Sequence, residues 1–151
     1  MNSIGKGESL DDIRRAFKLT HDAGIRTTAF FLFGLPGETK ETMQKTIDFA
    51  KDLDPDLCKV SIMTPFPGTK VFDLWSRGGF IKSRDWSKYN QHNPSEVYTH
   101  PNLDWNTIME YYNRFYREFY LNLNYVLKRI RTGLFNGELF YHIYYGLRID
   151  W

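Results

Sequence analysis

The hydrophobic pattern of the chain is clearest over residues 26–39, which read RTTAFFLFGLPGET. Every side chain over residues 28–33 is apolar or small, a run that is typical of a parallel strand covered on both faces. The Gly-Leu-Pro-Gly segment at 34–37 ends this strand, and Thr39 offers a hydroxyl that caps a following helix. Because α/β proteins bind ligands at the carboxyl ends of parallel strands, we expect the working surface at this loop.

Helices are expected on both sides of this strand. Ser9 and Asp12 have the spacing of a capping box, and the apolar stripe after them predicts a helix that ends at Gly24. A second helix begins at Thr39 and ends where the Asp-Pro-Asp segment at 54–56 stops it. The side chains of this second helix that should face the sheet are Met43, Ile47 and Ala50.

A second strand is expected over residues 57–63, and a helical crossover of this length predicts a right-handed βαβ unit with the first strand. The segment 64–69, TPFPGT, then repeats the arrangement of a rigid loop, and Thr69 caps a short helix. Two such loops at one edge, beside apolar side chains such as Leu32 and Phe66, suit a flat heterocycle that is recognised mainly by main-chain hydrogen bonds.

The C-terminal half is built differently. Residues 80–103 lack periodicity and predict a long irregular loop with a functional or covering role. A long amphipathic helix is expected from Asp104 to Arg131, and a further aromatic helix over 134–147. The anchors expected to hold the irregular loop on the body are Trp86, Tyr89 and Tyr98.

Composition narrows the class of protein. The formal net charge is +2, with both signs interspersed, which gives no argument for a nucleic-acid partner. Cys58 is the one cysteine, so a disulfide framework is excluded and a cytoplasmic location is expected. The sequence contains neither a signal-peptide pattern at its start nor an apolar run long enough for a membrane span.

Self-contained catalytic motifs are missing from the sequence. The four histidines are far apart, without the spacing of a metal site, and no GxSxG, GxGxxG or P-loop pattern occurs. Cys58 reads as a core residue of its strand. The GLPGET loop can be read as a structural turn, and Glu38 either as a ligand-binding carboxylate or as a charge that favours the helix N-terminus.

The order of these segments resembles a known family. GIRTTAFFLFGLPGETKETMQKTIDFAKDLDPD is followed by VSIMTPFPGTKVFD, a Gly-Gly turn and a Trp-Tyr loop. This order, over roughly residues 5–130, resembles the C-terminal part of radical S-adenosylmethionine enzymes, most of all the branch with an N-terminal cobalamin-binding domain. In that family an incomplete (β/α)6 barrel holds a [4Fe-4S] cluster on three cysteines, and the cluster reductively cleaves S-adenosylmethionine to a 5′-deoxyadenosyl radical.

The resemblance implies site residues. The family pattern Gly-x-Ile-x-Gly-x-x-Glu puts Leu32 at the Ile that packs on the adenine. The match departs where Phe30 stands at the first Gly, and where Gly37 takes the acidic position with Glu38 one residue later. The segment 64–66 matches the backbone that borders the adenine. The cofactor-binding residues implied are Leu32, Gly34, Leu35, Pro36, Gly37, Glu38, Thr64, Pro65 and Phe66.

The cluster motif CxxxCxxC is absent, and one cysteine cannot replace three thiolates. The resemblance therefore implies an α/β fold that is a C-terminal fragment of a TIM-like barrel, inert alone, with residues 1–82 as its last part and 83–151 as a covering loop and helical extension. The implied partners are the missing N-terminal barrel half and a cobalamin-binding domain. The parent would be a cobalamin-dependent methyltransferase or an oxidative cyclase with a small-molecule or lipid-like substrate, which Trp86 and Tyr89 are expected to touch.

Three further expectations stay open from the sequence. An unpaired edge on the first strand predicts self-association or limited stability of the chain alone. The aromatic and cationic residues over 111–117 offer a different function, a binding module or a membrane-surface helix. An intact small α/β protein with an unrelated ligand is the remaining reading, and no combination of nucleophile, base and anion site supports it.

Overall fold

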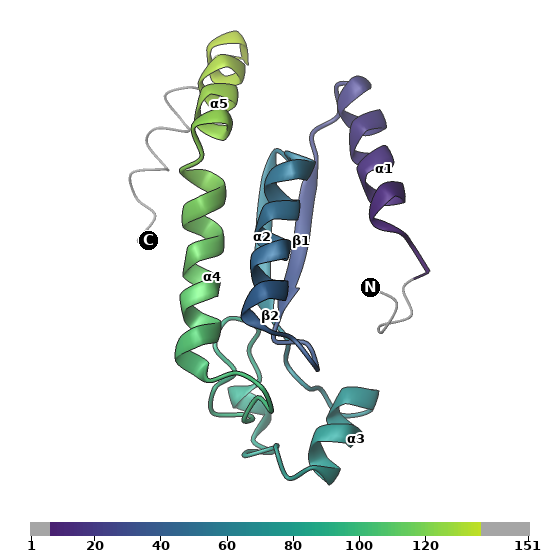
Figure 1. Ribbon diagram of the computed structural model, residues 1–151, viewed down its shortest axis with the longest axis vertical. Coiled ribbons are helices and arrows are strands. Elements are labelled where there is room, and N and C mark those ends of the chain that lie inside the picture. Colours follow the sequence, from purple (N-terminus) through teal and green to yellow (C-terminus); the bar gives the residue numbers. More distant parts are fainter. Residues whose placement is uncertain (1–6, 137–151) are drawn as a thin grey trace.

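The computed structural model describes residues 7–136 of the chain. Its centre is a parallel two-stranded sheet within an α/β arrangement, as the hydrophobic pattern predicts. Helices flank the sheet, and the loops after both strands gather at one end of it, near α3 (Figure 1). The elements are α1 (Leu10–Asp22), β1 (Thr28–Phe33), α2 (Lys40–Leu53), β2 (Leu57–Ile62), α3 (Lys70–Arg77), the 3-10 helix η2 (Trp86–Lys88), α4 (Trp105–Tyr120) and α5 (Leu123–Asn136).

The predicted helix starts are confirmed by cap geometry. Ser9 accepts a hydrogen bond from the Asp12 N–H while the Asp12 carboxylate accepts one from the Ser9 N–H, which is a complete capping box. Thr39 forms a capping box with Thr42 at the start of α2, and the Thr69 hydroxyl caps α3 by accepting a hydrogen bond from the Phe72 N–H. Because each cap satisfies backbone donors within a few residues, these starts are readable from the local sequence.

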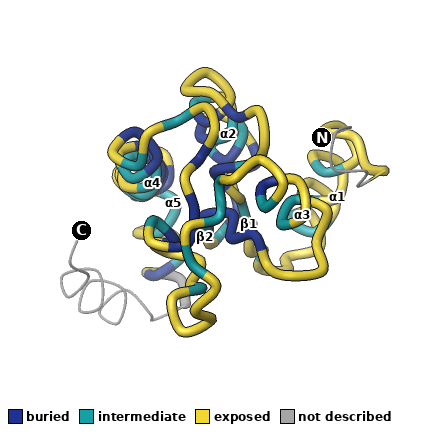
Figure 2. The backbone as a smooth tube through the Cα atoms, turned by 90° about the horizontal axis from the view of Figure 1, so that it is seen from below, coloured by how far each residue is buried: buried dark blue, intermediate teal, exposed yellow. Residues whose placement is uncertain are grey.

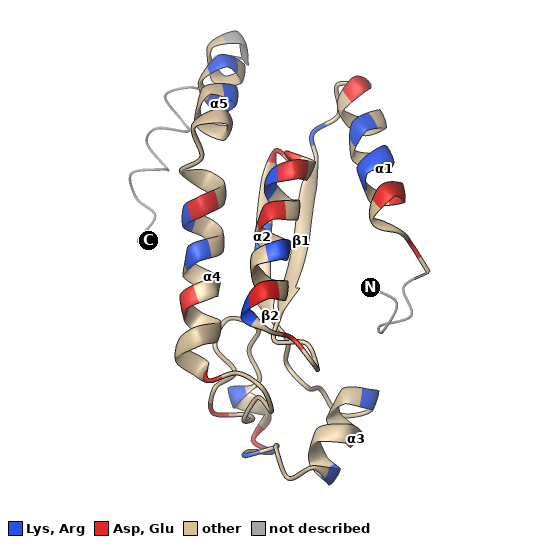
Figure 3. Ribbon diagram, viewed as in Figure 1, with Lys and Arg blue, Asp and Glu red and all other residues tan. Residues whose placement is uncertain are grey.

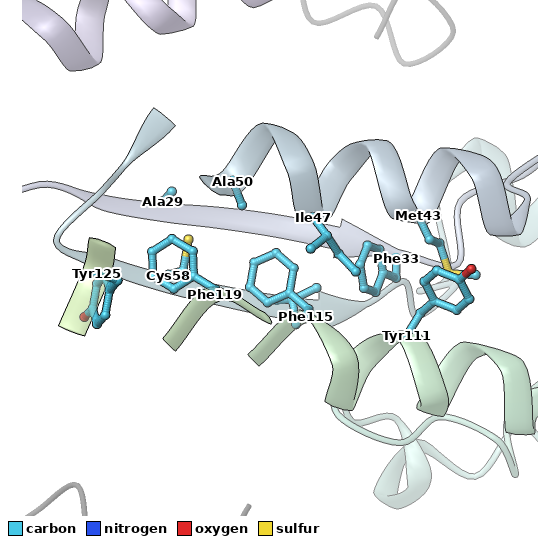
Figure 4. Close-up of a cluster of buried hydrophobic side chains, with 11 residues drawn as sticks. Ala29, Phe33, Met43, Ile47, Ala50, Cys58, Tyr111, Phe115, Phe119 and Tyr125 are labelled. Carbon is cyan, nitrogen blue, oxygen red and sulfur yellow. The ribbon is translucent and has the colours of Figure 1, made fainter. Parts of the chain in front are cut away.

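One face of the sheet carries the core. In the register of the sheet Ala29 pairs with Cys58 and Phe33 with Ile62, and all four side chains are buried. Helices α2 and α4 pack against this face and against each other, as Figure 4 shows for the rings that point from α4 toward the strands. The side chains that α2 buries there include the three predicted ones, Met43, Ile47 and Ala50.

The opposite face of the sheet corrects the expectation that β1 is covered on both faces. Phe30 is 75% exposed, and Leu32 beside it is 40% exposed. The burial of β1 alternates because only its odd-numbered side chains meet α2 and α4, while no described helix covers the other face. The apolar strand β1 therefore belongs to a sheet of which, within residues 7–136, only one face is covered by helices.

The two edges of the sheet differ. The hydroxyl of Tyr120 accepts a hydrogen bond from the Cys58 N–H (3.0 Å) and donates one to the Cys58 carbonyl (2.7 Å). Tyr116 does the same for Val60, at 3.3 and 3.2 Å. Tyr125 donates to the Asp56 carbonyl. A row of tyrosine hydroxyls therefore satisfies the outer edge of β2 in place of a further strand.

The outer edge of β1 has no such cover. In a parallel ladder alternate residues direct their backbone groups to each side. The carbonyls of Thr27 and Phe33 accept hydrogen bonds from the N–H groups of Leu57, at the start of β2, and Met63, just after its end. The backbone groups of Thr28, Phe30 and Leu32 thus point away from β2, and none of them hydrogen-bonds to a described residue. This edge is open to another strand as far as residues 7–136 are concerned.

The single long helix expected from Asp104 to Arg131 is wrong. The structure divides it into α4 and α5 at Leu121 and Asn122. Asn122 accepts a hydrogen bond from the Asn124 N–H through its side chain, and this local bond competes with a continuous helix. The break changes which side chains face the core, so that Tyr125 is buried while Leu123 is 70% exposed.

Several parts of the chain lie outside the core. Helix α1 has no buried residue, and Figure 2 shows it as mainly exposed at one side of the molecule. Charges of both signs alternate along α1, α2 and α4 in the view of Figure 3, in line with the small net charge. The expected helix over 134–147 falls mostly outside the described residues, which include only its start within α5.

Candidate functional site at the carboxyl edge of the sheet

The first loop is fixed by Glu38. Its carboxylate accepts hydrogen bonds from the N–H groups of Gly34 and Leu35, the latter at 3.2 Å. Gly34 has φ of 79°, and an added Cβ would lie 3.2 Å from the hydroxyl of Tyr98, so glycine is required there twice over. The loop is therefore a closed turn whose carboxylate binds its own backbone.

The side chain of Glu38 is buried, and carboxylates are rarely buried unless they have a hydrogen-bond or charge partner. Burial raises the pKa of Glu38, and the two backbone N–H groups oppose that rise. Of the two roles that the sequence left open, ligand binding by the carboxylate stays a prediction, and the charge does more than favour the helix start. It holds the turn that precedes α2.

His100 holds the same loop from the other side. Its Nδ1 accepts hydrogen bonds from the N–H groups of Asn102 and Leu103, so the proton of the neutral ring lies on Nε2, which donates to the Leu35 carbonyl at 3.2 Å. Burial lowers the pKa of His100. This role could not be read from the sequence, because the partner of His100 lies 65 residues away in the chain.

The second strand ends on the same cluster. The Tyr98 hydroxyl donates to the Met63 carbonyl at 2.7 Å, and the Trp105 indole N–H donates to the Tyr98 carbonyl. The Trp75 ring stacks at a tilt on Tyr98, with centroids 4.7 Å apart, and meets His100 edge-on at 5.6 Å. The last part of the irregular loop thus joins the ends of β1 and β2 into one body. The expectation that Tyr98 is an anchor is confirmed.

Lowering the pH is expected to destabilise the chain through His100. An unfolded histidine has a pKa near 6.5, whereas the folded pKa of His100 lies below that value, so the unfolded state takes up the proton first as the pH falls. Stability should therefore fall from pH 6.5 downward until the folded ring is also protonated. Urea unfolding at pH 7.5 and 5.5 measures this, and His100→Asn, which cannot titrate, should show a smaller fall.

The matched control for this measurement is His92→Gln, because His92 is exposed and contacts the Tyr112 hydroxyl away from the loop. It should keep the fall seen in the unchanged chain. An identical pH dependence in His100→Asn and the unchanged chain would show that His100 does not link protonation to folding.

The predicted cofactor residues lie together at this edge. Leu32 is the last residue of β1 on the open face, and the loop that begins at Gly34 is separated from it only by Phe33. In the second loop Thr64 and Pro65 are buried, while Phe66 is 40% exposed. The Thr64 hydroxyl donates to the Asn90 carbonyl at 2.9 Å, which ties this loop to the irregular segment. Their assignment to a cofactor stays a prediction.

The predicted substrate residues meet the second loop. The Tyr89 ring lies 5.9 Å from that of Phe66 and 4.9 Å from that of Trp86, between centroids. Trp86 is 56% exposed, so the expectation that it packs back on the body as an anchor is wrong. The reason is that η2 turns its indole outward, while Tyr89 is held by a hydrogen bond from its hydroxyl to the Ser83 carbonyl.

The residues present do not fit an iron-sulfur cluster. Three thiolates are needed, whereas Cys58 is the one cysteine; it is buried, and desolvation raises the pKa of its thiol to about 12. Among residues 7–136 no group of three His, Cys, Asp or Glu side chains is placed to hold a metal ion. Nor does any described helix have the length and apolar character needed to cross a membrane.

Comparison with known proteins finds methyltransferases and cyclases that are similar in sequence to this chain. No family profile matches the sequence. An uncharacterized methyltransferase of Pyrococcus horikoshii is 31% identical over 84% of this chain, and an anaerobic magnesium-protoporphyrin IX monomethyl ester cyclase of Rubrivivax gelatinosus is 30% identical over 81%. A bacteriochlorophyllide d C-12(1)-methyltransferase of Chlorobaculum tepidum is 24% identical over 93%.

The matches cover only part of each relative. The chain spans 27%, 21% and 30% of the lengths of these three proteins, about a quarter in each case. The matched region nevertheless takes in most of this chain. At about 30% identity the chain is similar to one segment of methyltransferases and of cyclases that act on magnesium-protoporphyrin monomethyl ester.

Proposed function

We propose that this chain is the C-terminal part of a radical S-adenosylmethionine enzyme, a methyltransferase or an oxidative cyclase, and forms the last two strands of an incomplete TIM-like barrel. The observation that carries the proposal is the pair of rigid loops at the carboxyl ends of two adjacent parallel strands. The similarity to methyltransferases and cyclases supports the reaction class. The involvement of cobalamin rests on the sequence resemblance alone.

The open edge and the open face of the sheet support a larger parent. A further strand beside β1 would satisfy the outward backbone groups of Thr28, Phe30 and Leu32. The same addition would turn the open face, with Phe30 and Leu32, toward a barrel interior. The tyrosine hydroxyls on β2 would then form the other end of the barrel wall. The partner of this chain in the proposal is the N-terminal barrel half.

The role of the chain's own residues is to bind and orient. Leu32 offers an apolar surface for an adenine ring, and the backbone of the 64–66 loop borders it. Glu38, His100 and Tyr98 hold the two loops in position, because their hydrogen bonds fix the Gly34 turn and the end of β2. A [4Fe-4S] cluster, held elsewhere in the parent, would supply the electron that cleaves S-adenosylmethionine. The chain alone is therefore inert in this proposal.

The proposal is tested first in the gene and then in the parent enzyme. An open reading frame upstream that encodes CxxxCxxC is expected, and a stop codon directly upstream would overturn the proposal. In the longer protein with its cluster reconstituted, Leu32→Ala should raise the KM for S-adenosylmethionine about tenfold, since it removes apolar contact with the adenine. Formation of 5′-deoxyadenosine as a function of S-adenosylmethionine concentration is the measurement.

The control for Leu32→Ala is Leu19→Ala on α1, a leucine that is 59% exposed and remote from both loops. It should leave the KM unchanged. Equal KM values for the two variants would remove Leu32 from the adenine site.

The alternative of an interaction or membrane-surface module has less support. Of the rings over residues 111–117, Tyr111 and Phe115 are buried in the core, and Tyr116 is bound to the edge of β2. These side chains stabilise the body and are not displayed for a partner. We therefore place the function of the chain at the carboxyl edge of the sheet.

A further inference from the structure

Helix α5 turns its large aliphatic side chains away from the body of the protein. These side chains recur every three or four residues and therefore share one face of the helix. Their exposed fractions range from 42% to 70%. We call these four residues the outer stripe: Leu123, Leu127, Ile130 and Leu134. The buried residues of α5 include Tyr125 and Gly133 and lie on another face. A helix that packs on a body normally buries its apolar face, so the outer stripe is available to a partner other than residues 7–136.

The positive charge of the chain is concentrated on the same helix. Its sequence contains three cations and no carboxylate, whereas the net charge of the whole chain is only +2. Figure 3 shows blue bands and no red ones along α5. Lys128 pairs with Asp54 at 2.9 Å and ties the helix to the body, while Arg131, which follows Ile130 in the chain, is exposed. An exposed apolar stripe on a helix with cations and no carboxylate is typical of a helix that lies on an anionic lipid surface.

Two other partners fit the outer stripe less well. A second copy of the chain would bring two cationic helices together, and the 14 residues of α5 make only two heptads, fewer than a coiled coil needs. The N-terminal barrel half of the proposed parent would join at the open edge of β1. Helices α4 and α5 lie at the other edge of the sheet, where the hydroxyls of Tyr120 and Tyr125 donate to the carbonyls of Cys58 and Asp56. Charge and position therefore favour an anionic lipid surface.

The position of α5 in the fold is compatible with such a contact. The helix packs mainly against α4, and it lies at the end of the molecule away from α3 (Figure 1). The loops after β1 and β2, which we assign to the cofactor, lie at the other end, near α3. A membrane bound by α5 would therefore leave these loops accessible to their ligands.

We propose that α5 lies on the surface of a membrane that contains anionic phospholipids. The outer stripe is buried among the acyl chains, and Arg131 binds the lipid phosphate groups. The helix lies along the surface, because no described helix has the length and apolar character needed to cross a membrane. Membrane binding is a property of this chain that goes beyond the reaction proposed above and does not depend on it.

Co-sedimentation of the purified chain with lipid vesicles tests the proposal. The unchanged chain should bind vesicles of phosphatidylcholine and phosphatidylserine, and it should bind vesicles of phosphatidylcholine alone at least about tenfold more weakly. The double variant Leu127→Gln, Ile130→Gln, which we call the stripe variant, should weaken binding to the anionic vesicles about tenfold, and Arg131→Gln about fivefold. All three side chains are exposed, so both variants should keep the circular dichroism spectrum of the unchanged chain.

Two matched variants control for nonspecific apolar and charge effects. The double variant Leu19→Gln, Ile25→Gln removes a leucine and an isoleucine that are 59% and 60% exposed, outside α5. Arg15→Gln removes an exposed arginine from α1. Both should bind the anionic vesicles as the unchanged chain does. No binding by the unchanged chain, or an equal loss in the stripe variant and in its leucine and isoleucine control, would overturn the proposal.

Light scattering without vesicles tests for a second copy of the chain on the outer stripe. The stripe variant should have the same mass as the unchanged chain. A dimer of the unchanged chain that the stripe variant converts into a monomer would assign the outer stripe to a second copy and overturn the lipid proposal. None of these results bears on the KM test at Leu32, so failure of membrane binding and failure of the proposed function are told apart.

Discussion

Replacing Phe115 with alanine is expected to lower the free energy of unfolding by about 3–5 kcal/mol, the usual cost of removing a buried phenylalanine from a core. Phe115 is fully buried, and its ring contacts those of Phe31 and Phe33 at centroid distances of 5.4 and 5.9 Å. It lies at the centre of the cluster that joins α4 to the sheet (Figure 4). Urea unfolding monitored by circular dichroism measures the loss.

The matched control is Phe30→Ala, which removes the same ring from a position that is 75% exposed. Its effect should stay within about 0.5 kcal/mol, as for most surface substitutions. Because domains are stable by only about 5–15 kcal/mol, Phe115→Ala should remove a large share of the stability of the chain. A loss for Phe115→Ala no larger than that for Phe30→Ala would show that α4 does not pack on the sheet as described.

The double variant Tyr116→Phe, Tyr120→Phe is expected to lower the free energy of unfolding by about 2–4 kcal/mol. Each hydroxyl satisfies both the N–H and the carbonyl of one residue on the outer edge of β2, Val60 or Cys58. Phenylalanine keeps the ring but leaves those buried backbone groups without a partner. The newly unsatisfied edge should also promote association, so light scattering is measured together with urea unfolding.

Tyr111→Phe is the control for the hydroxyl, since Tyr111 is buried on the same helix and its hydroxyl hydrogen-bonds to none of the described residues. It should be close to neutral in both measurements. If the double variant were as stable and as monodisperse as Tyr111→Phe, solvent rather than tyrosine would satisfy the edge of β2.

The two edges of the sheet determine where a further strand can be added. Tyrosine hydroxyls occupy one edge, so a further strand is directed to the other, beside Thr28 and Phe30. Self-association or limited stability of the isolated chain, caused by that unpaired edge, stays a prediction. In the proposed parent the same edge would receive the preceding strand of the barrel.

The candidate site was only partly readable from the sequence. The loops after both strands were predicted because Gly, Pro and the capping Thr residues act on their nearest neighbours in the chain. The hydrogen bonds by which Glu38 holds the first loop were not predicted, since a carboxylate near a helix start usually interacts with the helix dipole. In the structure Glu38 is buried, and its carboxylate accepts a hydrogen bond from the Gly34 N–H. Phe66 was assigned to the cofactor alone, and the structure adds its contact with Tyr89.

The sequence by itself determined both strands, the caps at Ser9, Thr39 and Thr69, and the order of the βαβ unit, because these depend on periodicity and on bonds within a few residues. Only the tertiary structure decided that tyrosines close β2 and that His100 binds Leu35. These features join segments that are distant in the chain, and no local pattern specifies which distant partner a buried polar group will find.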